Sequence, residues 1–164
     1  DSFEYLTTSM KKTFTYALAD EGDALVKHAR QCVSALRKHE VDARRLILAK
    51  SCKGRMQSNG EVDFTKDYAR PESMAQVRAA KILIERGLGF TPSMKISYVV
   101  TDASKRPMQV HPWIEAEQDG GIPGYDGRFY AERLAAAIGR ITEAFGWNAK
   151  ELFDGNRQTS LFSF

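Results

Sequence analysis

The chain has 164 residues, of which 43% are hydrophobic and 27% charged, the balance of an ordinary globular protein. This composition excludes a disordered or low-complexity chain, and two cysteines are too few for a disulfide-stabilised miniprotein. No apolar stretch is long enough to cross a membrane, so we expect a cytoplasmic protein with reduced thiols. The length allows one ordinary domain or two small lobes.

The net charge of +3 conceals an uneven distribution along the chain. Residues 44–86 hold ten basic and five acidic residues, whereas residues 113–132 hold one basic and five acidic residues. A basic centre beside an acidic flank can guide one face of a protein toward a polyanion. From charge alone, a solvated surface with both signs interspersed is the simpler interpretation.

Apolar residues recur at helical steps in two N-terminal segments, and this spacing predicts helices over residues 3–17 and 25–36. The acidic run at 20–23 separates them, and Asp23 is placed to cap the second helix. Cys32 lies on the apolar side of that helix, so we interpret it as a small buried hydrophobe. An apolar face on the first helix, with Phe3 and Tyr5 as candidates, would suit docking to another chain.

The middle of the chain alternates short strands with polar segments. Residues 45–49 form an aliphatic run that predicts a strand, and residues 51–73 read as a long polar loop. Such loops inside compact domains are usually functional. A helix is expected from Glu72 or Ser73 onward, and it ends at Gly87.

The second half of the chain predicts one strand pair and one long helix. Residues 94–100 are the strongest strand, with residues 108–110 as a candidate partner. After a glycine-rich connector, Asp126 is placed to cap a helix that Gly146 stops. The expected class is α+β, a mostly helical domain with a small β-sheet and a flexible C-terminal tail.

Residues that could support catalysis are sparse. His28 and Cys32 are four residues apart but lack the second ligand pair of a zinc site. Asp102 is a lone acid at a strand end, whereas two-metal phosphoryl transfer needs several carboxylates aimed at one point. We therefore expect no catalytic residue, metal or cofactor in this chain.

Three sequence segments follow one another along the chain in an order that indicates a family resemblance. They are Lys66-Asp67-Tyr68 with QVRAAK at 76–81, MKISYVV at 94–100, and the stretch from Gly124 to Leu152. In this order they resemble the C-terminal thumb of archaeal family B DNA polymerases, from about residue 3 to the end. Gln76 stands where the family has histidine, and no proline precedes it directly because Pro71 lies earlier. This departure from the family pattern affects the expected start of the local helix. The resemblance implies a thumb-like domain over residues 1–152 and a tail over residues 153–164.

The resemblance also implies where the chemistry lies. In that family the catalytic and proofreading acids belong to the palm and exonuclease domains, whose motifs do not occur here. The chain would then be the non-catalytic thumb of a DNA-directed DNA polymerase, a nucleotidyltransferase whose Mg²⁺ belongs to the palm of a large partner subunit. It would be the small subunit of a split polymerase or, as second choice, a cut or intein-derived fragment. The alternative function is a stand-alone DNA-binding or clamp-associated module.

A thumb holds the primer–template duplex through its phosphates, because phosphate contacts do not depend on base sequence. The resemblance places the basic middle segment against the duplex. The expected DNA-binding residues are Lys53, Arg55, Lys66, Tyr68, Arg70, Arg78 and Lys81. Tyr68 would donate a hydrogen bond to phosphate or, equally, pack the loop onto the core. Arg44, Arg45 and Arg86 are interpreted as solvated surface charge.

The C-terminal tail carries a motif of its own. Gln158-x-x-Leu161-x-x-Phe164 matches the box that binds sliding clamps of the PCNA type. The glutamine would form a hydrogen bond at the pocket rim, and one helical turn would place Leu161 and Phe164 side by side. An aromatic patch that folds back on the domain is the alternative interpretation.

Overall fold

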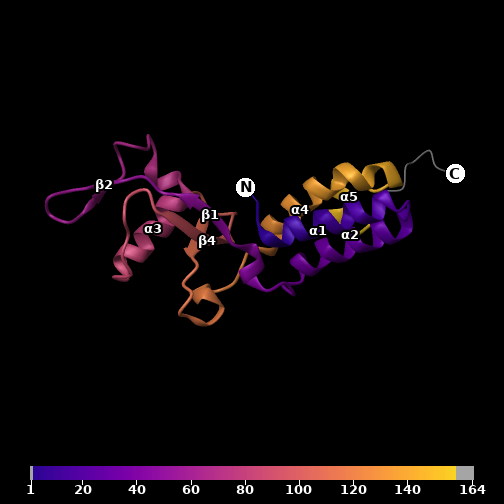
Figure 1. The fold of residues 1–164 in the computed structure, drawn as a ribbon, viewed down its shortest axis with the longest axis horizontal. Coiled ribbons are helices and arrows are strands. Elements are labelled where there is room, and N and C mark those ends of the chain that lie inside the picture. Colours follow the sequence, from indigo (N-terminus) through magenta and orange to yellow (C-terminus); the bar gives the residue numbers. More distant parts are fainter. Residues whose placement is uncertain (1, 158–164) are drawn as a thin grey trace. The chain divides into compact units, whose positions relative to one another are not determined.

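The computed structural model describes residues 2–157. Within these residues the chain forms five α-helices, a three-stranded antiparallel sheet and a two-stranded hairpin (Figure 1). The α+β class predicted from the sequence is therefore confirmed. The described residues divide into two compact units, unit 1 with residues 43–126 and unit 2 with residues 2–42 and 127–157.

Unit 2 is helical. It contains α1 (Glu4–Leu18), α2 (Gly22–Arg37), α4 (Gly127–Thr142) and the short α5 (Ala149–Asp154), and α4 packs against each of the others. The core between these helices is mainly aliphatic and aromatic, and its fully buried side chains include Leu25, Val33, Leu36, Tyr130, Leu134 and Ile138. The helical spacing seen in the sequence thus predicted the three long helices of this unit correctly.

The helix α5 was not predicted from the sequence. It begins with a capping box, in which the Glu151 backbone N–H donates to Asn148 Oδ1 at 2.8 Å and the Asn148 N–H donates to Glu151 Oε1 at 3.1 Å. It ends at Gly155, whose φ of +77° lies in the left-handed region that glycine tolerates. The spacing Asn148-x-x-Glu151 was the available signal.

The first helix presents an unexpected face to the core of unit 2. Its buried residues are Tyr5, Ser9 and Thr13, and the Tyr5 hydroxyl donates to the Cys32 carbonyl at 2.8 Å. Tyr5 is therefore no exposed docking residue, and Phe3 is also buried, with its ring edge-to-face against Tyr130.

The neighbouring row of the helix forms an apolar stripe, which we call the α1 stripe: Leu6, Met10, Phe14 and Leu18. Phe14 is 50% and Leu18 89% exposed.

Unit 1 contains the sheet in the order β1–β4–β5, all antiparallel. Its strands are β1 (Leu48–Ser51), β4 (Lys95–Asp102) and β5 (Gln109–Pro112), and α3 (Ala75–Glu85) packs on them. The predicted pairing of residues 94–100 with residues 108–110 is confirmed, since Val100 lies opposite Val110. The strand expected at 45–49 begins only at Leu48, because residues Ala43–Leu46 form a 3₁₀ turn.

The segment predicted as a long loop, residues 51–73, contains a hairpin of β2 (Arg55–Met56) and β3 (Val62–Asp63). The Gly60 N–H donates to the Gln57 carbonyl at 3.0 Å, and Gly60 has a φ of +85°. The Glu61 N–H in turn donates to Asn59 Oδ1 at 3.0 Å. Asn59-Gly60 was the sequence signal for this hairpin, because such turns need a left-handed residue.

Candidate nucleic-acid interface

All seven residues predicted to bind DNA lie in unit 1, on three of its segments. Lys53 and Arg55 follow β1, three residues lie between β3 and α3, and Arg78 and Lys81 lie on α3. The middle three are Lys66, Tyr68 and Arg70. The predicted clamp-binding residues Gln158, Leu161 and Phe164 lie outside the described residues.

Tyr68 joins two of these segments. Its hydroxyl accepts a hydrogen bond from the Lys53 backbone N–H at 2.9 Å, and its side chain is half-buried. The contact fixes the start of the hairpin segment to the loop that carries Lys66 and Arg70. This contact supports the loop-packing role of Tyr68, and its binding to phosphate stays a prediction.

Cys52, next to this contact, offers a direct test of the local packing. Burial raises the pKa of its thiol to about 11, and the hydrogen bond with Tyr68 offsets part of the rise. A thiol with that pKa is only about one part in a thousand thiolate at pH 8, so alkylation should be roughly 200-fold slower than for an ordinary thiol. We expect iodoacetamide to modify Cys32, which is half-buried, before Cys52. Mass spectrometry after timed quenching measures this order, and equal rates in the native chain would contradict the packing. In guanidinium both thiols should react alike.

Arg55 is partly neutralised by its neighbours. Its Nε lies 3.8 Å from Asp67 Oδ2, and the arginine side chain is 63% exposed. Asp63 faces the same region, where hydrogen bonds from the Thr65 hydroxyl and N–H hold the pKa of its carboxyl below the usual value. Both acids reduce the positive potential around Arg55.

Three of the predicted cations are exposed and lie outside the hydrogen bonds and ion pairs of the described residues. Within residues 2–157, the side chains of Lys53, Lys66 and Arg70 form neither a hydrogen bond nor an ion pair. A charged side chain outside any hydrogen bond or ion pair is available to a ligand, and its removal breaks neither kind of interaction within the protein. The Asp63 carboxyl still interacts electrostatically with Lys66. We call these three residues the free cations.

The two basic residues of α3 differ in their surroundings. The Arg78 side chain is half-buried, and its Nη1 donates to the Glu72 carbonyl at 3.2 Å. Burial lowers the pKa of its guanidinium, with an opposing effect from Tyr98. Lys81 is exposed, and its ammonium lies 5.9 Å from the centre of the Phe64 ring. The helix thus gives Arg78 a structural contact and leaves Lys81 accessible.

A shallow hollow of about 570 Å³ lies along the hairpin. The two predicted cations Arg55 and Lys66 line it together with polar turn residues that the sequence analysis did not single out: Gln57, Ser58 and Asn59. Short polar side chains of this kind donate hydrogen bonds to phosphate oxygens. The hairpin signal at Asn59-Gly60 could have identified them.

Arg86, which the sequence analysis assigned to the solvated surface, forms an ion pair with Glu117. The Arg86 guanidinium lowers the pKa of the Glu117 carboxyl.

No group of three or more His, Cys, Asp or Glu side chains within residues 2–157 is arranged to hold a metal ion. Among these residues, no helix has both the length and the apolar character needed to span a membrane.

Comparison with known proteins relates the chain to a polymerase. No family model matches it. It is similar to DNA polymerase 2 of Aeropyrum pernix, with 30% identity over 150 residues. The match covers 87% of this chain and 16% of the polymerase, so the chain spans about one sixth of the length of that relative.

Proposed function

We propose that this chain is the non-catalytic thumb of a family B DNA-directed DNA polymerase and serves DNA replication by binding the primer–template duplex. The observation that carries the proposal is the set of free cations in unit 1, in a chain similar to a DNA polymerase over most of its length. Phosphate contacts from such side chains bind a duplex without reading its sequence.

The contacts of unit 1 rank the seven predicted residues. The free cations and Lys81 are the phosphate-binding residues of the proposal, because their side chains form no ion pair within residues 2–157, although Asp63 interacts electrostatically with Lys66. Arg55 contributes less, since Asp67 lies beside it. Arg78 holds the segment before α3, and Tyr68 positions the loop.

The α1 stripe in unit 2 supports a partner chain rather than a stand-alone module. Phe14 and Leu18 expose large apolar side chains on one helix face, and such a face in water favours docking. The partner of the proposal is the large subunit with palm and exonuclease, which would supply the catalytic carboxylates and their Mg²⁺. A stand-alone module should be polar on this face. The tail residues Gln158, Leu161 and Phe164 would tether the assembly to a sliding clamp.

Size-exclusion chromatography with the large family B polymerase chain of the same source tests the proposal, followed by primer extension with and without this chain. We expect co-elution and a gain of extension. The double variant Phe14→Ser/Leu18→Ser should weaken the complex about 100-fold, since burial of these side chains contributes about 3 kcal/mol.

The control removes two other exposed apolar side chains, which lie in unit 1. Ile84 and Leu88 of unit 1 are 40% and 49% exposed, and Ile84→Ser/Leu88→Ser should leave the complex intact. If neither a complex nor a gain of extension is found, the chain is a stand-alone DNA-binding module and the thumb proposal is wrong.

A further inference from the structure

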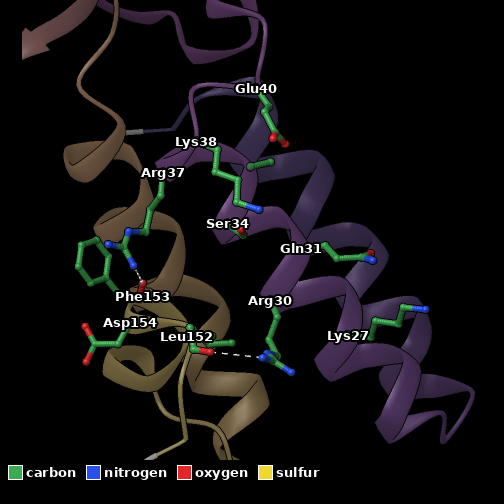
Figure 2. A pocket seen from close by; sticks show the side chains of 12 residues that line it. Lys27, Arg30, Gln31, Ser34, Arg37, Lys38, Glu40, Leu152, Phe153 and Asp154 are labelled. Atoms are coloured by element: carbon green, nitrogen blue, oxygen red, sulfur yellow. Dashed lines mark hydrogen bonds between the residues drawn. The ribbon is translucent and has the colours of Figure 1, made fainter.

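A groove in unit 2 lies between α2 and the C-terminal segment that contains α5. Its volume is about 760 Å³, and it is bounded by one face of α2 and by residues 152–155 (Figure 2). Four exposed cations of α2 and its C-terminal end line the groove: Lys27, Arg30, Arg37 and Lys38. None of them was singled out from the sequence, and all lie in a different unit from the free cations.

The two arginines of the groove are held in place by neutral groups. The Arg30 guanidinium lies 4.4 Å from the Trp147 ring centre, and its Nη2 donates to the Gly155 carbonyl at 3.3 Å. Seven residues later, Arg37 lies 4.7 Å from the Phe153 ring centre, and its Nη1 donates to the Phe153 carbonyl at 2.7 Å. Figure 2 shows both hydrogen bonds crossing from α2 to this segment.

These contacts orient the guanidinium groups without neutralising them. Each guanidinium has five N–H donors, and the carbonyl contact uses one of them, so donors remain for a ligand. Lys27 and Lys38 form no hydrogen bond or ion pair within residues 2–157. The groove also contains the acids Glu40 and Asp154, and neither lies within ion-pair distance of the four cations. With four cations and two acids, the groove carries a net positive charge.

We propose that this groove binds the phosphodiester backbone of a nucleic acid, as a second contact that does not depend on the free cations of unit 1. From Lys27 to Lys38 the helix rises about 16 Å at 1.5 Å per residue. One strand of duplex DNA advances about 3.4 Å per phosphate, so this row of charge matches about five phosphates.

The side chains of the groove favour a phosphate backbone over an acidic peptide. Gln31 and Ser34 lie between the cations and add short hydrogen-bonding groups, which suit phosphate oxygens. The Phe153 ring, the large apolar group of the groove, is covered by the Arg37 guanidinium. The groove thus offers charge and hydrogen bonds rather than an apolar pocket for a peptide side chain.

The test uses the full chain and a fluorescein-labelled duplex of about 20 base pairs, with fluorescence anisotropy measured across a sodium chloride series. The variant Lys27→Gln/Lys38→Gln should bind about 60-fold more weakly in 0.1 M salt, and its log–log salt slope should be shallower by about 1.8. Neither lysine side chain forms a hydrogen bond or ion pair within residues 2–157, so thermal melting should be unchanged. The matched control Lys11→Gln/Lys105→Gln removes two exposed lysines outside both surfaces and should change the slope little.

A groove variant that binds like the control overturns the inference. An oligoglutamate of about ten residues is the competing probe, and displacement of the duplex by it at equal charge concentration would also overturn the inference in favour of an acidic peptide. The unit 1 variant Lys53→Gln/Lys66→Gln/Arg70→Gln, measured in parallel, separates the two proposals. If it retains full affinity while the groove variant loses it, the groove is the nucleic-acid site and the proposed unit 1 interface is wrong.

Discussion

Replacement of all three free cations of unit 1 by glutamine is expected to weaken duplex DNA binding about 500-fold in 0.1 M salt. Each phosphate contact changes the logarithm of the affinity by about 0.9 per decade of salt. Relative to 1 M salt, one decade higher, the loss of one contact therefore lowers the affinity about eightfold in 0.1 M salt. Lys53, Lys66 and Arg70 are exposed, and their side chains form no hydrogen bond or ion pair in the described part of the chain, so the variant loses charge and keeps its internal hydrogen bonds and ion pairs.

Fluorescence anisotropy across a salt series measures both the affinity and the slope, which should become shallower by about 2.7. The control Lys11→Gln/Lys105→Gln/Arg140→Gln removes the same charge, two lysines and one arginine, from exposed positions outside both proposed surfaces. Equal losses in the two triple variants would mean that net charge alone drives binding, and the proposed interface would then be abandoned.

Truncation of Tyr130 to alanine is expected to lower the free energy of unfolding by about 3–5 kcal/mol. The Tyr130 ring is completely buried in unit 2, with the Phe3 ring centre at 5.1 Å and the Phe129 ring centre at 5.0 Å, both edge-to-face. The substitution removes these ring contacts and leaves a cavity that neighbouring helices fill only partly. The loss is a large part of the stability of an ordinary domain.

Chemical denaturation followed by circular dichroism measures this loss, and Tyr130→Phe separates the contribution of the ring from that of the hydroxyl. Phe14→Ala is the matched control, because its ring is 50% exposed on the α1 stripe and its removal should lower the free energy of unfolding by only about 1 kcal/mol. If the two alanine variants were equally stable, the ring cluster around Tyr130 would not be the core of unit 2.

The sequence predicted the long elements of this chain because their side chains repeat with a clear period. The apolar spacing in α2 and α4 is helical, and the aliphatic run of β4 is bounded by polar residues on both sides. Short elements lack enough residues for a period to show. The two-residue strands of the hairpin and the six-residue α5 depend on turn and cap chemistry instead, at Gly60 and at Asn148.

For the candidate interface, the sequence located the basic residues but not their availability. Arg55, Arg78 and Arg86 look alike in the sequence, yet their partners Asp67, the Glu72 carbonyl and Glu117 distinguish them from Lys53, Lys66 and Arg70. Glu117 follows Arg86 by 31 positions, so no local pattern reveals that pair. Only the tertiary packing determines which of these charged side chains already have a hydrogen-bond or ion-pair partner.

By itself, the sequence determined the α+β class, the long helices, the β4–β5 pairing and the basic middle segment, because these follow from periodicity and composition. The tertiary structure alone decided which row of α1 faces the core and which cations remain free. It also formed the groove of unit 2, where Arg30 donates a hydrogen bond to the carbonyl of Gly155, 125 positions away in the sequence. The physical reason is that burial and ion pairing depend on which distant segments meet, and chain folding, rather than local residue order, brings them together.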